Sequence, residues 1–133
     1  MAPLAPLRLS RTSAVCALVA LCAALALTPA AARSLADALP QVALAELPRE
    51  ARDVNAAIRN GGPFAYPRDG VVFGNRERIL PVEPRGYYHE YTVPTPGMKS
   101  RGARRIVCGG PVRAPHACWY TGDHYQSFKR IQE

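Results

Sequence analysis

The spacing of hydrophobic positions changes from helical to alternating near residue 63 of this 133-residue chain. From Pro48 onwards, apolar side chains recur at helical intervals, acidic residues stand in the first turns, and Asn60 followed by two glycines ends the pattern. After Pro63 the period becomes two, with frequent proline and glycine. We therefore predict one helix over 48–60 and a series of short strands after it. The predicted strands are Val71–Phe73, Arg85–Val93, Arg104–Cys108, Trp119–Tyr120 and Phe128–Ile131.

One helix followed by short antiparallel strands is typical of an α+β domain. We expect the N-terminal helix to pack on one face of a short-stranded antiparallel β-sheet. Loops at 74–78 and 98–103 would project from that sheet, where functional side chains are commonly found.

The N-terminus has the order of segments found in a secretory signal peptide. Arg8 and Arg11 precede an apolar run from Ala14 to Leu27, and small residues follow up to Ala32. The apolar run is shorter than the ~20 residues that span a bilayer. We therefore expect a signal peptide over residues 1–32 and no membrane attachment after its cleavage. The mature protein would be secreted, either to the periplasm or outside the cell.

Cleavage at this position would leave a weakly ordered lead-in over 33–46 and a single domain over 47–133. The whole chain has 17 lysines and arginines against 10 acidic residues, a formal net charge of +7. Such an excess on a small surface favours polyanionic partners such as RNA, DNA or acidic glycans. Charge that serves only solubility is the alternative, and composition alone leaves it open.

Two cysteines, Cys108 and Cys118, lie within the expected domain. Export to an oxidising compartment and an even count favour a disulfide that closes this short loop. Together with His116 and His124 the same cysteines could instead form a metal site, but their spacing fits no common zinc pattern. We expect the disulfide and no metal.

The segment around Glu90 places one carboxylate opposite several guanidinium groups. Strand alternation puts Tyr88, Glu90 and Thr92 on one face, and a hairpin can bring Arg101 and Arg105 close to that face. A cross-strand salt bridge would account for Glu90 and one arginine. The second arginine leaves positive charge unmatched, which suits a bound phosphate.

Cleavage of RNA requires a base for the 2′-OH proton and an acid for the leaving 5′-oxygen. Glutamate is ionised at neutral pH, so Glu90 is a candidate base. Histidine is the natural acid, and the chain offers three. His89 faces away from Glu90 by parity and His116 lies in the expected disulfide loop, which leaves His124 as the candidate. Arginine can neutralise the pentavalent phosphorane without a metal.

Four segments resemble the secreted microbial guanyl-specific ribonucleases, in the same order and at similar spacing. They are DGVVFGNRE (69–77), GYYHEYTV (86–93), RGARRIVCG (101–109) and YTGDHY (120–125). The resemblance covers about Leu47 to Ile131 and is closest to the small bacterial members, with barnase and binase more distant. It implies the microbial ribonuclease fold.

The resemblance also implies catalytic roles. Glu90 matches the general base and His124 the general acid. Arg101 and Arg105 match the arginines that hold the scissile phosphate and stabilise the transition state. Tyr125 matches a tyrosine that contacts phosphate and the guanine site.

The segment FGNRE matches the guanine-recognition loop of the family. Glu77 matches the carboxylate that accepts hydrogen bonds from guanine N1–H and N2–H₂. The backbone of Asn75 and Arg76 would meet guanine O6 and N7, with Phe73 near the stacking face. Gly74 stands where close relatives often have a larger polar residue, which is expected to loosen this loop.

We therefore expect a secreted endoribonuclease that cleaves single-stranded RNA 3′ of guanosine through a 2′,3′-cyclic phosphate, without a metal or other cofactor. Two alternatives remain: a polyanion-binding or toxin-like module without turnover, and a base-nonspecific ribonuclease if Gly74 spoils the guanine loop. The expected partners are single-stranded RNA and a cognate intracellular protein inhibitor. We expect the protein to be a monomer.

Overall fold

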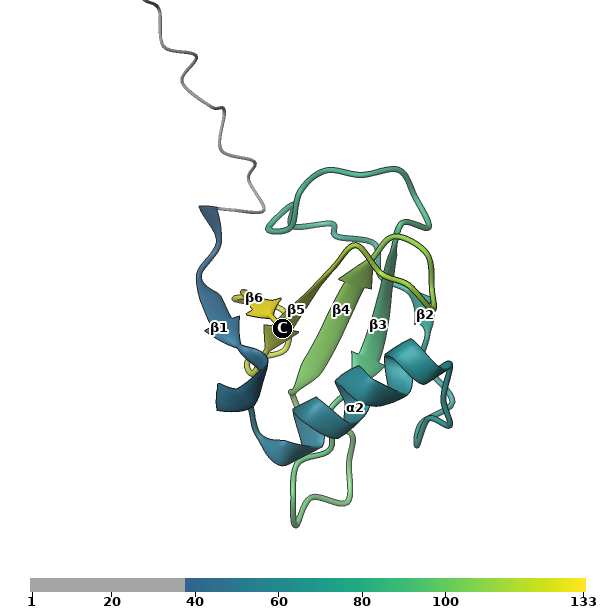
Figure 1. Ribbon diagram of the computed structural model, residues 1–133, viewed down its shortest axis with the longest axis vertical. Coiled ribbons are helices and arrows are strands. Elements are labelled where there is room, and N and C mark those ends of the chain that lie inside the picture. Colours follow the sequence, from purple (N-terminus) through teal and green to yellow (C-terminus); the bar gives the residue numbers. More distant parts are fainter. Residues whose placement is uncertain (1–37) are drawn as a thin grey trace, which may run out of the picture. The chain divides into compact units, whose positions relative to one another are not determined.

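A computed structural model describes residues 38–133, so the predicted signal peptide and the first residues of the lead-in lie outside the described residues. Helix α2, Arg49–Asn60, is the predicted helix. Pro48 stands at its N-cap, and Gly61 ends it in the left-handed conformation, with φ of 78°, which glycine adopts without steric cost. The helix buries Ala51 and Ile58, and Figure 1 shows it lying across the sheet at β3 and β4.

Six strands form one sheet in the order β1-β6-β5-β4-β3-β2. Neighbouring strands from β2 to β6 pair antiparallel, as predicted. Strand β1 pairs parallel with β6, so the sheet is mixed rather than wholly antiparallel. The strands are β1 (Gln41–Ala43), β2 (Val71–Val72), β3 (Tyr88–Thr92), β4 (Arg105–Gly109), β5 (Ala117–Thr121) and β6 (Lys129–Gln132).

The expected lead-in contains secondary structure in its described part. Strand β1 lies beside β6, with Val42 opposite Ile131, and a short 3-10 helix η1, Leu44–Glu46, follows it. The backbone amide of Arg130 also donates to the carbonyl of Pro40 at 2.7 Å. These residues are ordered by the C-terminal strand, a partner that local sequence does not reveal.

The two faces of the sheet have separate hydrophobic clusters. One lies between the sheet and α2, and we call it the helix-side cluster; its buried members are Leu47, Ala51, Ile58, Tyr91, Val93, Ile106, Cys108, Cys118 and Ile131. The other cluster is on the opposite face and buries Leu80, Tyr88, Val107, Trp119 and Phe128. Tyr88 and Tyr91 thus point to opposite faces, which confirms the predicted alternation of β3. Glu90 shares the face of Tyr88.

The disulfide between Cys108 and Cys118 is present, as predicted. The two cysteines are directly opposite each other on β4 and β5, in the helix-side cluster. Among residues 38–133, none of the helices has the length and hydropathy needed to span a membrane.

Candidate active site

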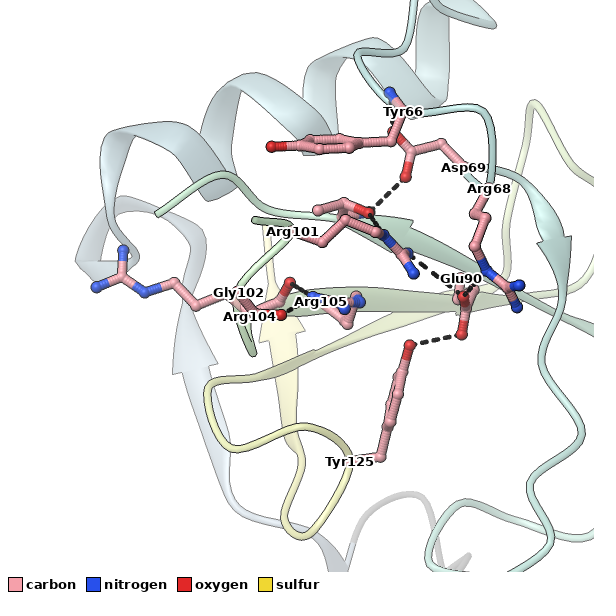
Figure 2. A network of polar contacts seen from close by, with 10 residues as sticks. Tyr66, Arg68, Asp69, Glu90, Arg101, Gly102, Arg104, Arg105 and Tyr125 are labelled. Carbon is pink, nitrogen blue, oxygen red and sulfur yellow. Dashed lines mark hydrogen bonds and ion pairs between the residues drawn. The ribbon is translucent and has the colours of Figure 1, made fainter. Parts of the chain in front are cut away.

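Glu90 is the centre of a polar network on the sheet face away from α2 (Figure 2). It lies on β3 and is only 7% exposed. Its Oε1 is 3.5 Å from Nη2 of Arg101, and its Oε2 accepts a 2.5 Å hydrogen bond from the hydroxyl of Tyr125. A buried carboxylate needs such partners to remain charged. The network therefore gives each of the two Glu90 carboxylate oxygens a polar partner.

Arg101 and Arg105 both belong to this face, as predicted, but only Arg101 pairs with Glu90. Arg101 is fixed by a 2.9 Å hydrogen bond from its Nε to the hydroxyl of Thr92. Arg105 lies opposite Thr92 in the β3–β4 register rather than opposite Glu90. Arg104 has the opposite parity, and Figure 2 shows its side chain directed away from Glu90.

Arg105 is 2% exposed and supports the neighbouring loop. Its Nη1 donates to the carbonyls of Gly102 (2.9 Å) and Arg104 (2.8 Å), and its guanidinium carbon is 5.9 Å from the ring centre of Tyr125. Its Nε is buried and has no hydrogen-bond partner within the described region. A buried donor without an acceptor is costly, so an anion placed beside Tyr125 would be stabilised here.

His124 and Tyr125 lie in a strained turn between β5 and β6. Both have left-handed backbone conformations, with φ of 56° and 71°. The side chain of Asp123 fixes the turn by accepting hydrogen bonds from Thr121 and from the backbone of Gln126 and Ser127. The amide of His124 donates to the carbonyl of Ala103 at 3.1 Å, which connects the turn to the 98–103 loop that contains Arg101. These contacts fix the backbone of His124, and its exposed imidazole lies with its ring centre 4.9 Å from that of Tyr125.

The hydroxyl of Tyr125 remains protonated through the physiological range. Burial, and then the hydrogen bond to Glu90, raises its pKa to about 12. Because the neutral hydroxyl donates to Glu90, it adds no negative charge to the cluster.

The predicted recognition loop forms one wall of a cleft of about 750 Å³. The predicted residues that line this cleft are Phe73, Asn75, Arg76, Glu77, His124 and Tyr125. Phe73 and Tyr125 stack on each other, with ring centres 5.0 Å apart. Glu90, Arg101 and Arg105 are not among the lining residues, and Tyr125 connects them to the cleft.

The side chain of Asn75 fixes the recognition loop. Its amide nitrogen donates to the carbonyls of Leu80 (2.9 Å) and Pro81 (3.2 Å), and its oxygen accepts from the Leu80 amide. A Cβ at Gly74 would approach Arg76 Cγ only to 3.6 Å, an ordinary contact. The loop geometry thus does not require glycine at position 74. The hydrogen bonds of the Asn75 side chain to Leu80 and Pro81 do not involve Gly74 either.

The other two histidines have contacts away from this cleft. His89 Nδ1 is 2.9 Å from the carbonyl of Gly70, and His116 Nδ1 is 3.2 Å from the hydroxyl of Tyr87. With Cys108 and Cys118 joined to each other, the four residues considered as metal ligands do not form a site. Within residues 38–133, no group of three histidine, cysteine or acidic side chains is arranged to hold a metal ion.

Comparison with known proteins decides the family. The family model described as ribonuclease matches residues 28–132. Guanyl-specific ribonuclease Sa of Kitasatospora aureofaciens is 50% identical over 97 residues, which are 73% of this chain and 98% of that protein. The chain belongs to the ribonuclease family. Guanyl-specific ribonuclease St of Saccharopolyspora erythraea, another relative, is 55% identical over 89 residues, 67% of this chain and 84% of that protein.

Solved structures of the ribonuclease family share the fold. A crystal structure of ribonuclease Sa2 with guanosine-2′-cyclophosphate superposes with a TM-score of 0.64 at 47% identity, covering 71% of this chain and 96% of that one. Ribonuclease Sa2 with 3′-GMP gives a TM-score of 0.63 at 46% identity, covering 71% and 97%. The resemblance stated from the sequence is therefore confirmed.

One charged residue of this ribonuclease site was missed by the sequence analysis. Arg68, in the turn before β2, has its Nε 4.0 Å from Oε1 of Glu90. Strand parity could not identify Arg68 because it lies outside every predicted strand. Asp69 beside it was the available signal, since aspartate commonly fixes tight turns.

Proposed function

We propose that this protein is an endoribonuclease that cleaves single-stranded RNA on the 3′ side of guanosine through a 2′,3′-cyclic phosphate. The supporting observation is that Tyr125 joins two sets of residues: it hydrogen-bonds to Glu90 of the charged network and lines the same cleft as His124 and the 73–77 loop. Identity of 50% to a guanyl-specific ribonuclease and the guanosine cyclic phosphate bound by ribonuclease Sa2 support the same activity.

In the first step Glu90 takes the proton of the 2′-OH, whose oxygen attacks phosphorus. The new P–O2′ bond forms as the P–O5′ bond breaks, and His124 protonates the departing 5′-oxygen. Hydrolysis of the resulting cyclic phosphate reverses the roles: His124 activates water and Glu90 returns a proton to the 2′-oxygen. Each cycle returns both groups to their starting protonation states.

Arg101 and Arg105 stabilise the phosphorane electrostatically. The buried, unpartnered Nε of Arg105 would gain its acceptor when phosphate binds beside Tyr125. Because Arg105 is already held by two carbonyl groups, little side-chain entropy is lost at that moment.

Guanine is selected by complementary hydrogen bonds. Glu77 accepts from N1–H and N2–H₂, while backbone amides of Asn75 and Arg76 meet O6 and N7. Other bases leave these groups unpaired, which is why selectivity should be sharp. Phe73 and Tyr125 are in contact, so a base that enters between them must part the rings. If Tyr125 is the ring that moves, its hydrogen bond to Glu90 breaks and the carboxylate becomes available to the 2′-OH.

The biological setting is part of the same proposal. The disulfide within the domain and the signal-like N-terminus support secretion. A secreted ribonuclease endangers the cell that makes it, so a cognate intracellular inhibitor is expected, as is a monomeric enzyme.

Cleavage of four dinucleotides by the purified mature chain in EDTA tests the proposal. We expect rapid turnover of GpC through a cyclic phosphate, and slow turnover of ApC, CpC and UpC. Equal cleavage of all four would retain Glu90 and His124 but remove the guanine site. Binding of RNA without cleavage would leave a polyanion-binding module.

A further inference from the structure

The turn that precedes β2 is fastened to the strand that contains Glu90. Asp69 Oδ1 accepts a 2.7 Å hydrogen bond from the Thr92 amide, and the Gly70 amide donates to the carbonyl of Glu90 at 2.8 Å. His89 adds a third contact through the Gly70 carbonyl. Contacts at residues 89, 90 and 92 therefore fix the backbone next to Arg68.

The guanidinium of Arg68 lies near Glu90 but does not form a hydrogen bond with it. The 4.0 Å separation from Oε1 is an ion pair but too long for a hydrogen bond. The side chain is 67% exposed, whereas that of Arg101 is 26% exposed and bonded to Thr92. Among the described residues, no side-chain hydrogen bond of Arg68 is present, so its donors are open to a ligand.

The charge balance of the cluster favours an anion. One carboxylate, Glu90, faces the guanidinium groups of Arg68 and Arg101, and the neutral Tyr125 adds no charge. Figure 2 shows Arg68 and Arg101 reaching Glu90 from opposite sides. A phosphate beside Glu90 would therefore lie between two guanidiniums, which can each donate two parallel hydrogen bonds.

We propose that Arg68 is a third arginine of the active site and binds the substrate phosphate directly, opposite Arg101 and Arg105. This inference rests on the proposed function, because it places the scissile phosphate beside Glu90. Arg68 is thus a further catalytic residue, and it comes from the turn before β2 rather than from the 98–103 loop or β4.

Calorimetric binding of guanosine and 3′-GMP separates phosphate contacts from base contacts. Arg68→Gln should weaken 3′-GMP binding about tenfold and leave guanosine binding within about twofold, since a charge-assisted hydrogen bond is lost. Arg68→Lys should recover part of the loss. Arg52→Gln, on an exposed helix position, removes the same charge and should change neither affinity.

A second background tests whether Arg68 acts through Glu90. In the Glu90→Gln variant, adding Arg68→Gln should still weaken the binding of 3′-GMP, because Arg68 contacts the phosphate and not only Glu90. Loss only when Glu90 is present, or equal effects on guanosine and 3′-GMP, would overturn the inference. If wild type binds 3′-GMP no better than guanosine, the inference also fails. If the wild-type protein binds 3′-GMP through Arg68 but does not cleave GpC, the proposed function is contradicted and the inference about Arg68 is not.

Discussion

Glu90 is buried among cations, and its environment makes substitution informative. Glu90→Gln keeps the shape and can still accept the hydrogen bond from Tyr125, but it cannot take a proton from the 2′-OH. General base catalysis contributes roughly 10²–10⁴-fold, so we expect kcat for GpC to fall at least 100-fold. The measurement is steady-state cleavage of GpC, with thermal unfolding to show that the fold persists. Near-normal turnover would remove Glu90 from the mechanism.

Two of the three histidines provide a matched comparison for the general acid. His124 is exposed at the cleft, whereas His116 contacts Tyr87 at a distance from it. His124→Ala should lower GpC turnover at least 100-fold, and His116→Ala should leave it within a few-fold. Cleavage rates of the two variants, measured side by side, check this assignment. Comparable losses in both would point to a general effect on folding.

The two carboxylates near the recognition loop separate base selection from catalysis. Glu77 lines the cleft, whereas Glu83 lies outside it. Glu77→Gln replaces one acceptor with a donor that opposes guanine N–H groups, so kcat/KM for GpC should fall about 100-fold. The value for ApC should hardly change, and Glu83→Gln should affect neither substrate. An equal loss on both dinucleotides would mean that Glu77 is not a base-reading residue.

At the scale of elements, the sequence predicted those features that depend on local period. The helix, the five strands after it, and the face shared by Glu90 and Arg105 all follow from spacing. Strand β1 does not, because three residues pair with β6 at the far end of the chain. Arg68 was missed for a similar reason: its place beside Glu90 depends on the tertiary hydrogen bond from Thr92 to Asp69.

The turn after β5 gives a pH-dependent prediction. Hydrogen bonds from Ser127 to the Asp123 carboxylate lower the pKa of Asp123 from 3.8 to about 2. A lowered folded-state pKa means that the stabilisation is present above pH 4 and is lost as pH falls toward 2. Ser127→Ala should therefore lower Tm by about 4 °C at pH 7, and the difference should shrink steadily as the pH falls from 4 through 2. Thermal unfolding of both proteins across this range checks it; a constant difference would contradict the assignment.

At the scale of the molecule, the disulfide and the catalytic residues are on opposite faces of the sheet. Cys108 and Cys118 belong to the helix-side cluster, so replacing both with alanine should affect stability rather than chemistry. Opening a loop of this length is expected to cost about 2–3 kcal/mol. Urea unfolding should report that loss, while GpC turnover at 25 °C stays within about twofold. A large fall in turnover of the folded variant would show that the bridge also shapes the site.

The net charge of the chain makes RNA binding dependent on salt. The full chain has a formal net charge of +7, and only Arg8 and Arg11 of its basic residues lie in the predicted signal peptide, so the mature protein stays basic. It should bind single-stranded RNA less tightly as salt increases, because the release of counterions from RNA is less favourable at high salt. The inactive Glu90→Gln variant allows this slope to be measured on an uncleaved oligonucleotide containing guanosine. Each phosphate contact on a single strand contributes about 0.7 to the slope of log K against log salt. If Arg68 contacts phosphate, adding Arg68→Gln should reduce the slope by about 0.7. Arg52→Gln should leave it unchanged, so equal reductions by both substitutions would mean that Arg68 contributes only diffuse charge.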